Sequence, residues 1–150
     1  MTVQAIFDTL AADAELSALG ITGDRIFEAH SIDERPVHSG PFMVLKWEES
    51  TLYTQTYTGM QNGIPRAPRV LTIWVHIPWD ETRQFDLIDT ILNRVDLILD
   101  AMEHVEGADG YTVTLASKSG RSGNLSDEGF KTITRNAVFG VLYRLETQPV

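Results

Sequence analysis

Residues 69–105, which read RVLTIWVHIPWDETRQFDLIDTILNRVDLILDAMEHV, decide the fold of this chain. Their first part alternates between aliphatic and other side chains with a period of two, which is typical of a β-strand with one face in a core. The aliphatic members of this alternation are Leu71, Ile73, Val75 and Ile77. Pro78 ends the predicted strand, and Asp80 is then a suitable N-cap for a helix.

The helix that follows is predicted from apolar side chains that step by three and four residues. These side chains are Phe85, Ile88, Leu92, Val95, Leu99 and Met102. Such spacing indicates a wide buried stripe, and Gly107 and Gly110 mark the end of the pattern.

The chain before this segment predicts a helix and two strands. Apolar residues at helical spacing from Val3 to Leu10 predict an opening helix of about three turns with Thr2 as its N-cap. Asp13 is placed to cap a separate short turn. Residues 24–30 and 42–47 have the apolar runs of two strands.

After the long helix, two more strands complete the pattern. Tyr111, Val113 and Leu115 alternate with smaller or polar residues, residues 117–127 are a Ser- and Gly-rich loop, and residues 130–145 form a long closing strand. This order predicts an α+β fold: a mostly antiparallel sheet of about five strands with two helices packed on one face. We expect a single domain over residues 1–150.

Composition excludes several classes of protein. The chain has 150 residues and no cysteine, so disulfide frameworks, zinc fingers, iron–sulfur sites and thiol nucleophiles are excluded. No apolar run approaches the ~20 residues that span a bilayer, so we expect no membrane partner. With 21 acidic residues against 12 Lys and Arg, the net charge of −9 disfavours sequence-specific DNA binding.

Catalytic signatures are not found in the sequence. His30, His38, His76 and His104 fall in different predicted elements, and none has the i, i+4 spacing of a metal-binding helix. Residues 119–123, SGRSG, lack the spacing and the strand–turn–helix context of a nucleophile elbow. Asp96 and Asp100 share a helix face that we interpret as solvated. We therefore predict no catalytic, cofactor-binding or metal-binding residues, no cofactor and no enzymatic activity.

Charge is concentrated in residues 80–109. Nine acids (80, 81, 86, 89, 96, 100, 103, 106 and 109) stand against Arg83 and Arg94, so this segment carries −7 of the total −9. Asp100, Glu103 and Glu106 are predicted in the last turns of the helix, where the helix dipole disfavours acids. This surface is either an ordinary solvated face or one that repels an anion or meets a basic partner.

Residues 48–67 form the longest predicted connection, and we interpret it as an extended arm or hairpin that contacts a neighbouring subunit or the end of a tube. It is rich in Thr and Tyr, with no clear core face, so it needs a partner to become ordered. Large apolar groups left over after the core is assigned also mark contacts with partners. The predicted interface residues are Tyr53, Tyr57, Met60, Ile64, Arg66, Arg69 and Leu97.

The ordered set of elements resembles the tail terminator family of long-tailed bacteriophages, most closely those of actinobacterial phages. The matching residues begin with the spacing Leu10, Asp13, Leu16, Leu19 and the strands 24–27 and 41–45. They continue through 69–76 with Asp86, Ile88 and Ile91, and they end with 127–130 leading into 137–141. Residues 48–67 are the least family-like part.

The resemblance implies a structural virion protein. Such proteins form a ring of six subunits that caps the completed tail tube, stops tube polymerisation and presents a surface to the head-side connector. DNA passes through the bore without sequence-specific contacts, and a negatively charged lumen would keep it from binding. The implied partners are further copies of the chain, the tail tube protein and the connector, in a virion assembled in the host cytoplasm.

Two other functions stay open at this point. One is another head–tail connector, such as a stopper or head-completion protein, because these are also small ring-forming α/β proteins. The other is a small-ligand-binding α+β domain, although the sequence offers no recognisable set of convergent polar groups.

Overall fold

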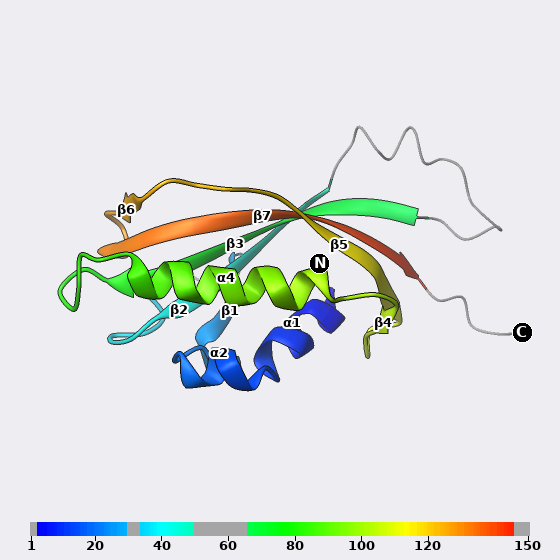
Figure 1. The fold of residues 1–150 in the computed structure, drawn as a ribbon, viewed down its shortest axis with the longest axis horizontal. Helices are drawn as coiled ribbons and strands as arrows, with labels where there is room; N and C mark the ends of the chain where they lie inside the picture. Colours follow the sequence, from blue (N-terminus) through cyan, green and yellow to red (C-terminus); the bar gives the residue numbers. More distant parts are fainter. Residues whose placement is uncertain (1–2, 30–33, 50–65, 146–150) are drawn as a thin grey trace, which may run out of the picture.

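The computed structural model of the protein describes residues 3–29, 34–49 and 66–145, and these residues form two layers (Figure 1). One layer is a long twisted sheet, and the other consists of helices on one face of that sheet. The described residues thus form an α+β fold, as the sequence predicts.

The sheet has seven strands, two more than expected. They are β1 (Ile26–Glu28), β2 (Phe42–Glu49), β3 (Arg66–Pro78), β4 (Val105–Glu106), β5 (Tyr111–Arg121), β6 (Leu125–Asp127) and β7 (Thr132–Leu145). The strand order is β1-β2-β3-β7-β5-β4, and β6 also pairs with β7. β1 runs parallel to β2, while every other pairing among the described strands is antiparallel, so the sheet is mixed.

The helices are shorter than the sequence pattern indicates. They are α1 (Gln4–Ala11), α2 (Ala14–Ala18), the 3₁₀-helix η1 (Gly23–Arg25) and α4 (Asp86–Asp100). Val3 occupies the N-cap position of α1, and the predicted cap Thr2 lies outside the described residues. The capping role predicted for Asp13 is confirmed, because its carboxylate accepts a hydrogen bond of 2.9 Å from the Leu16 amide.

Both predicted ends of the long helix are wrong. Asp80 does not cap it: the Glu81 amide donates to the Pro78 carbonyl at 3.1 Å, which closes a turn instead, and α4 begins at Asp86. The helix ends at Asp100, so Glu103 and Glu106 lie beyond it and are not set against its dipole. Val105 leaves the helix pattern to pair with β5 as part of β4.

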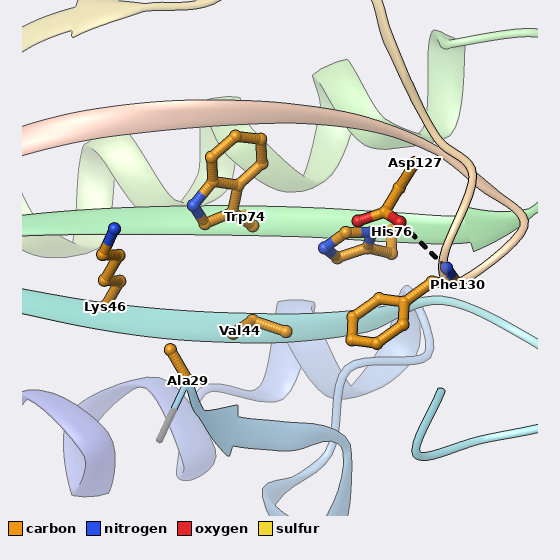
Figure 2. Close-up of a pocket in the computed structure, with 7 residues that line it drawn as sticks. All are labelled: Ala29, Val44, Lys46, Trp74, His76, Asp127 and Phe130. Carbon is orange, nitrogen blue, oxygen red and sulfur yellow. Dashed lines mark hydrogen bonds between the residues drawn. The ribbon is translucent and has the colours of Figure 1, made fainter. Parts of the chain in front are cut away.

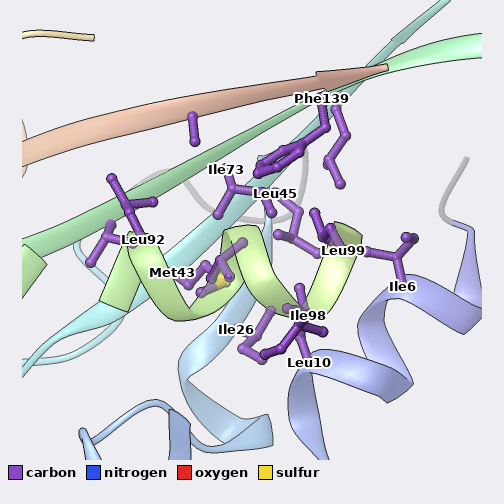
Figure 3. Close-up of a cluster of buried hydrophobic side chains, with 14 of the residues drawn as sticks. Ile6, Leu10, Ile26, Met43, Leu45, Ile73, Leu92, Ile98, Leu99 and Phe139 are labelled. Atoms are coloured by element: carbon purple, nitrogen blue, oxygen red, sulfur yellow. The ribbon is translucent and has the colours of Figure 1, made fainter. Parts of the chain in front are cut away.

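The core lies between α1, α4 and one face of the sheet. Figure 3 shows Ile6 of α1 beside Leu99 of α4 and Leu10 of α1 beside Ile98 of α4, below the sheet residues Ile73 and Phe139. The stripe side chains Ile88, Leu92, Val95 and Leu99 are completely buried, as are Leu71, Ile73 and Val75 of β3. The two hydrophobic periodicities of residues 69–105 therefore identify the two surfaces that pack together.

Residues 117–127, predicted as a loop, mostly continue the sheet. β5 extends to Arg121, and β6 adds three residues along the same edge of β7, so this part of the chain and β7 form one long hairpin (Figure 1). The register of β5 against β7 shifts between Val113 and Leu115 and again between Lys118 and Gly120. Each shift is a bulge, which lets a strand rich in Ser and Gly follow the curved sheet.

The predicted connection 48–67 is partly sheet. Residues 48 and 49 belong to β2, and 66 and 67 belong to β3. Residues 50–65 lie outside the described residues, so the predicted arm stays a prediction.

Candidate interaction surfaces

Of the predicted interface residues, the structure places Arg66, Arg69 and Leu97. The remaining four, Tyr53, Tyr57, Met60 and Ile64, lie outside the described residues. Arg66 is the first residue of β3 and pairs with Arg144 of β7. Arg69 is buried, with its guanidinium carbon 5.3 Å from the centre of the Trp47 ring. Arg69 is therefore a packed residue of the sheet within the subunit, and its contact with a neighbouring subunit stays a prediction.

Leu97 lies in the other layer, on α4, with 63% of its surface exposed. A leucine this exposed, on a helix whose stripe is otherwise buried, is not needed by the core. The structure thus places Arg69 and Leu97 in different layers rather than in one surface.

The edge of the sheet at β5 and β6 carries two more exposed leucines, which the sequence analysis did not identify. Leu115 is 47% exposed and Leu125 is 40% exposed. The sequence predicts a strand in which Leu115 alternates in step with Tyr111 and Val113. The bulge at Thr114 breaks that alternation and sets Leu115 opposite Leu142, on the face of the sheet away from the helices.

The face of the sheet away from the helices has a shallow pocket of about 200 Å³ (Figure 2). Its lining residues are Ala29, Val44, Lys46, Trp74, His76, Asp127 and Phe130. His76 stacks on Phe42 with ring centres 4.9 Å apart and planes 7° apart, and its centre lies 5.3 Å from that of Phe130. The pocket is therefore an aromatic surface with a single ammonium group and a single carboxylate at its rim.

His76 belongs to this packing. Its Nδ1 lies 2.8 Å from the hydroxyl of Thr132, and burial lowers the pKa of His76 to about 4, although the nearby Asp127 acts in the opposite direction. The imidazole is therefore neutral near pH 7 and acts as a packed aromatic ring.

The acids of residues 80–109 divide into partnered and unpartnered groups. Asp96 forms salt bridges with Arg121 at 2.6 Å and with Lys118 at 3.0 Å, and Asp89 forms one with Arg135. The interpretation of Asp96 as part of a solvated helix face is therefore wrong. The bulged strand β5 brings two cations over α4, and both pair with this carboxylate. These pairs fasten the helix to the hairpin.

Other acids of this segment hold the backbone. Glu81 accepts a hydrogen bond of 2.8 Å from the Gly40 amide, and Asp109 accepts bonds from the amides of Gln4 and Tyr111 at 3.0 and 3.1 Å. Besides Glu81 and Asp109, five further acids are exposed and make no ion pair within the described part of the chain: Asp80, Asp86, Asp100, Glu103 and Glu106. Glu106 also lies beside Asp8 and Asp13 in a groove between α1 and β4. The exposed carboxylates that make no ion pair in the described chain thus lie near the two ends of α4.

The structure assigns no metal-binding or membrane-spanning element to the described residues. Within them, no group of three or more His, Asp and Glu side chains is arranged to hold a metal ion. Residues 3–29, 34–49 and 66–145 also hold no helix that is long and apolar enough to cross a membrane. His38, His76 and His104 lie apart in the fold, and His30 is outside the described residues.

Comparison with known proteins finds a likeness at the level of structure. No family model matches the chain, and no curated protein matches it. Among solved structures, the chain is similar to a chain of the virion of a native gene transfer agent particle, with a TM-score of 0.65 and 16% sequence identity. The alignment covers 95% of this chain and 94% of the other. At this identity the likeness shows a shared fold.

Proposed function

We propose that this chain is a structural virion protein that forms a ring, caps the tail tube of a phage-like particle, ends tube polymerisation and joins the tail to the head-side connector. The observation that carries this proposal is the likeness to a virion chain, which covers 95% of this chain and nearly all of the other. The resemblance of the sequence to tail terminators supports the narrower role at the end of the tube.

A ring needs two different contact surfaces on each subunit, because a head-to-tail contact joins unlike patches. The described part of the chain offers such a pair. Leu97 is exposed on the helix layer, while Leu115 and Leu125 are exposed on the hairpin of the sheet. Large exposed apolar side chains on two sides of a small domain favour assembly into a ring, which we expect to be a hexamer.

The five unpartnered acids support a role beside DNA. Asp100, Glu103 and Glu106 are exposed near the end of α4, where no described cation offsets them. A bore lined with such carboxylates repels phosphates and lets DNA pass without binding. The proposed partners are therefore further copies of the chain, the tail tube protein, the head-side connector and passing DNA.

We also propose that the protein is not an enzyme. The buried His76 is held by aromatic packing, and Asp89 and Asp96 are used in ion pairs between α4 and the hairpin. These groups have structural partners and need no substrate to account for their positions.

The test is arrest of tube growth. Purified tail tube protein of the same particle is polymerised with and without this chain, and tube lengths are measured by negative-stain electron microscopy. We expect added chain to shorten the tubes and to form a ring density at one end. Tubes of unchanged length with no ring at either end would refute the terminator role.

Labelling of intact particles separates the terminator from other connectors. An antibody against the chain should bind at the tube end of the head–tail junction. Binding at the head side of the junction would favour a stopper or head-completion protein instead.

A further inference from the structure

The pocket on the outer face of the sheet has room for one large apolar side chain. Its volume is about 200 Å³, and a cavity of roughly 150 Å³ takes up a molecule the size of benzene. Val44 and His76 form its buried floor, Trp74 is half-buried beside them, and Phe130 lies at one end (Figure 2). A half-buried tryptophan in a pocket is typical of the centre of a protein–protein contact.

Leu125 extends this apolar surface. It pairs with Thr134 of β7, which pairs with His76 of β3. Residues that pair directly across strands project from the same face of a sheet, so Leu125 lies about 10 Å from His76 on the outer face. Leu125 is 40% exposed. The helices α1 and α4 pack against the opposite face of the sheet and do not cover this surface.

Leu97 projects from the other side of the subunit. Among the large apolar residues in the described part of the chain it is the most exposed, at 63%. At ~100° per residue it points about 180° away from Ile88 and the buried stripe of α4. Because that stripe faces the sheet, α4 and the sheet stand between Leu97 and the pocket of the same subunit. Leu97 can therefore meet this pocket only in another copy of the chain.

The exposed side of α4 is acidic. Asp100 lies one turn after Leu97 and Asp86 lies at the start of the helix, and both are exposed. Arg94 is the single cation among residues 86–100, and Asp13 holds it through hydrogen bonds of 2.7 and 3.0 Å. The surface around Leu97 therefore favours a partner that presents positive charge.

The rim of the pocket presents such charge. Lys46 lines the pocket, and the Arg35 guanidinium donates a hydrogen bond of 3.3 Å to the Phe130 carbonyl. Lys46 pairs with Glu48 at 3.2 Å, but both side chains are more than half exposed, so this pair is weak. Asp127, the carboxylate of the pocket, accepts a hydrogen bond of 2.8 Å from the Phe130 amide. The ammonium group of Lys46 is therefore available to an acid on a partner.

We propose that the pocket receives Leu97 of a second copy of the chain, with Asp100 of that copy paired to Lys46. This inference rests on the proposed ring and names a contact that closes it. Asp100 lies about 4.5 Å beyond Leu97 along the helix axis, and Lys46 lies about 7 Å from Val44 along β2, so one lysine side chain spans the difference. The contact joins unlike surfaces on opposite sides of the subunit, as a head-to-tail ring requires.

Single-cysteine variants test the contact directly, because the chain has no cysteine of its own. Asp100→Cys and Lys46→Cys, both at exposed positions, are purified separately, mixed, and treated with a short bis-maleimide. We expect cross-linked dimers in the mixture and far fewer in either variant alone, because the contact joins unlike surfaces. The double variant should give a ladder of cross-linked chains up to the size of the ring.

An exchange of charges tests the ion pair. Lys46→Glu and Asp100→Lys should each raise the protein concentration at half assembly by about fivefold or more, because each brings two like charges together. The double variant restores opposite charges at every contact and should assemble within about twofold of the unsubstituted chain. Asp80→Lys makes the same change at an exposed acid before α4 and should leave assembly unchanged. Analytical ultracentrifugation measures assembly, and circular dichroism should show the same fold in all four variants.

The outcomes separate this inference from the proposed function. Rings that form normally in both single charge variants, with no cross-link in the mixed sample, overturn this contact and leave the ring intact. A double charge variant that assembles no better than the single ones contradicts the pairing of Asp100 with Lys46. Normal rings of Lys46→Glu that no longer cap tubes assign the pocket to the tail tube protein and also overturn the inference. An unsubstituted chain that stays monomeric at high concentration overturns both proposals.

Discussion

Arg94 on α4 holds Asp13, the N-cap of α2, through two hydrogen bonds: Nε to Oδ2 at 3.0 Å and Nη2 to Oδ1 at 2.7 Å. The same carboxylate accepts a hydrogen bond from the Leu16 amide at 2.9 Å. One side chain therefore caps a short helix and fastens it to the long one. Because α2 has only five residues, its position depends on this contact more than on its own helix propensity.

Replacing Asp13 should separate its two roles. Asp13→Asn keeps an oxygen for the cap but loses the charge, and we expect it to lower the free energy of unfolding by about 1–2 kcal/mol. Asp13→Ala also removes the cap and should cost about 1 kcal/mol more. Urea denaturation at pH 7 measures both effects. Asp100→Asn is the control, since Asp100 is exposed and makes no ion pair within the described chain.

The Asp13 contact also predicts a dependence on pH. The hydrogen bonds from Arg94 lower the pKa of Asp13 below 3.8, its ordinary value. The unfolded chain therefore takes up this proton first, and the stabilisation is present above pH 3.8 and lost as the pH falls through the lower, folded-state value. The difference in stability between the unsubstituted chain and Asp13→Asn should shrink below pH 3.8. A difference that stays constant down to pH 2 would contradict this.

His76 should make the fold sensitive to mild acid. Its pKa is lowered from 6.5 to about 4, so between these values the unfolded chain binds a proton that the folded chain does not. Stability should therefore fall as the pH falls from 6.5, by a total of about 3 kcal/mol at pH 4 and below. Thermal unfolding followed from pH 7.5 to 4 measures this loss.

His76→Phe should remove that loss. At pH 7 the variant should be less stable by about 1–3 kcal/mol, because the buried hydroxyl of Thr132 loses its partner. Toward pH 4 its disadvantage should disappear. His38→Gln, at an exposed position, is the control and should follow the unsubstituted chain. Parallel curves for His76→Phe and the unsubstituted chain would mean that another group carries the acid sensitivity.

Leu97 should matter for assembly and not for folding. With 63% of its surface exposed, Leu97→Ser should change the free energy of unfolding by less than about 0.5 kcal/mol. If Leu97 contacts a neighbouring subunit, the same change lowers the fraction of assembled protein in analytical ultracentrifugation. Leu87→Ser, less exposed and at the start of α4, provides the comparison on the same helix. Unchanged assembly of Leu97→Ser would remove this residue from the interface.

The segment from Thr51 to Ile64 should be dispensable for folding and required for assembly. Its replacement by a short Gly/Ser bridge should give a folded subunit that fails to form the ring or to arrest tube growth. The control replaces the segment with a scrambled version of its own sequence, which keeps its length and composition. Normal particles from the deletion would show that the segment has no role in assembly.

Hydrophobic periodicity sufficed to predict the parts of the fold in which one face is buried without interruption. The stripe of α4 and the alternation of β3 both correspond to buried side chains, and the closing strand predicted over 130–145 buries Phe139, Val141 and Tyr143. The capping role of Asp13 could also be predicted, because it depends only on the residue type and on the amide of Leu16 three residues later.

The features that the sequence analysis missed depend on long-range contacts, which a single sequence does not reveal. The predicted alternation of Leu115 with Val113 misses the register shift between them, because a bulge leaves no clear mark in a strand of Thr, Ala and Ser. Asp80 has the residue type of an N-cap, but it lies in a turn closed by the Glu81 amide and the Pro78 carbonyl, and the helix begins only at Asp86. Asp96 was read as solvated because its partners Lys118 and Arg121 were assigned to a loop. In each case a long-range pairing overrode a local preference.

The central position of β7 has a consequence for how the protein is made. This strand lies between β3 and β5 in the sheet. Each of these two strands therefore lacks one of its neighbours until residues 132–145 have been synthesised. A chain interrupted before that point leaves open the edge of β3 that pairs with β7 and is prone to aggregate. The sheet is therefore complete only after β7 has been synthesised, and we expect the folding rate to be limited by the pairing of strands far apart in the sequence. If the chain assembles into the proposed ring, this dependence on β7 keeps copies that lack it out of the ring.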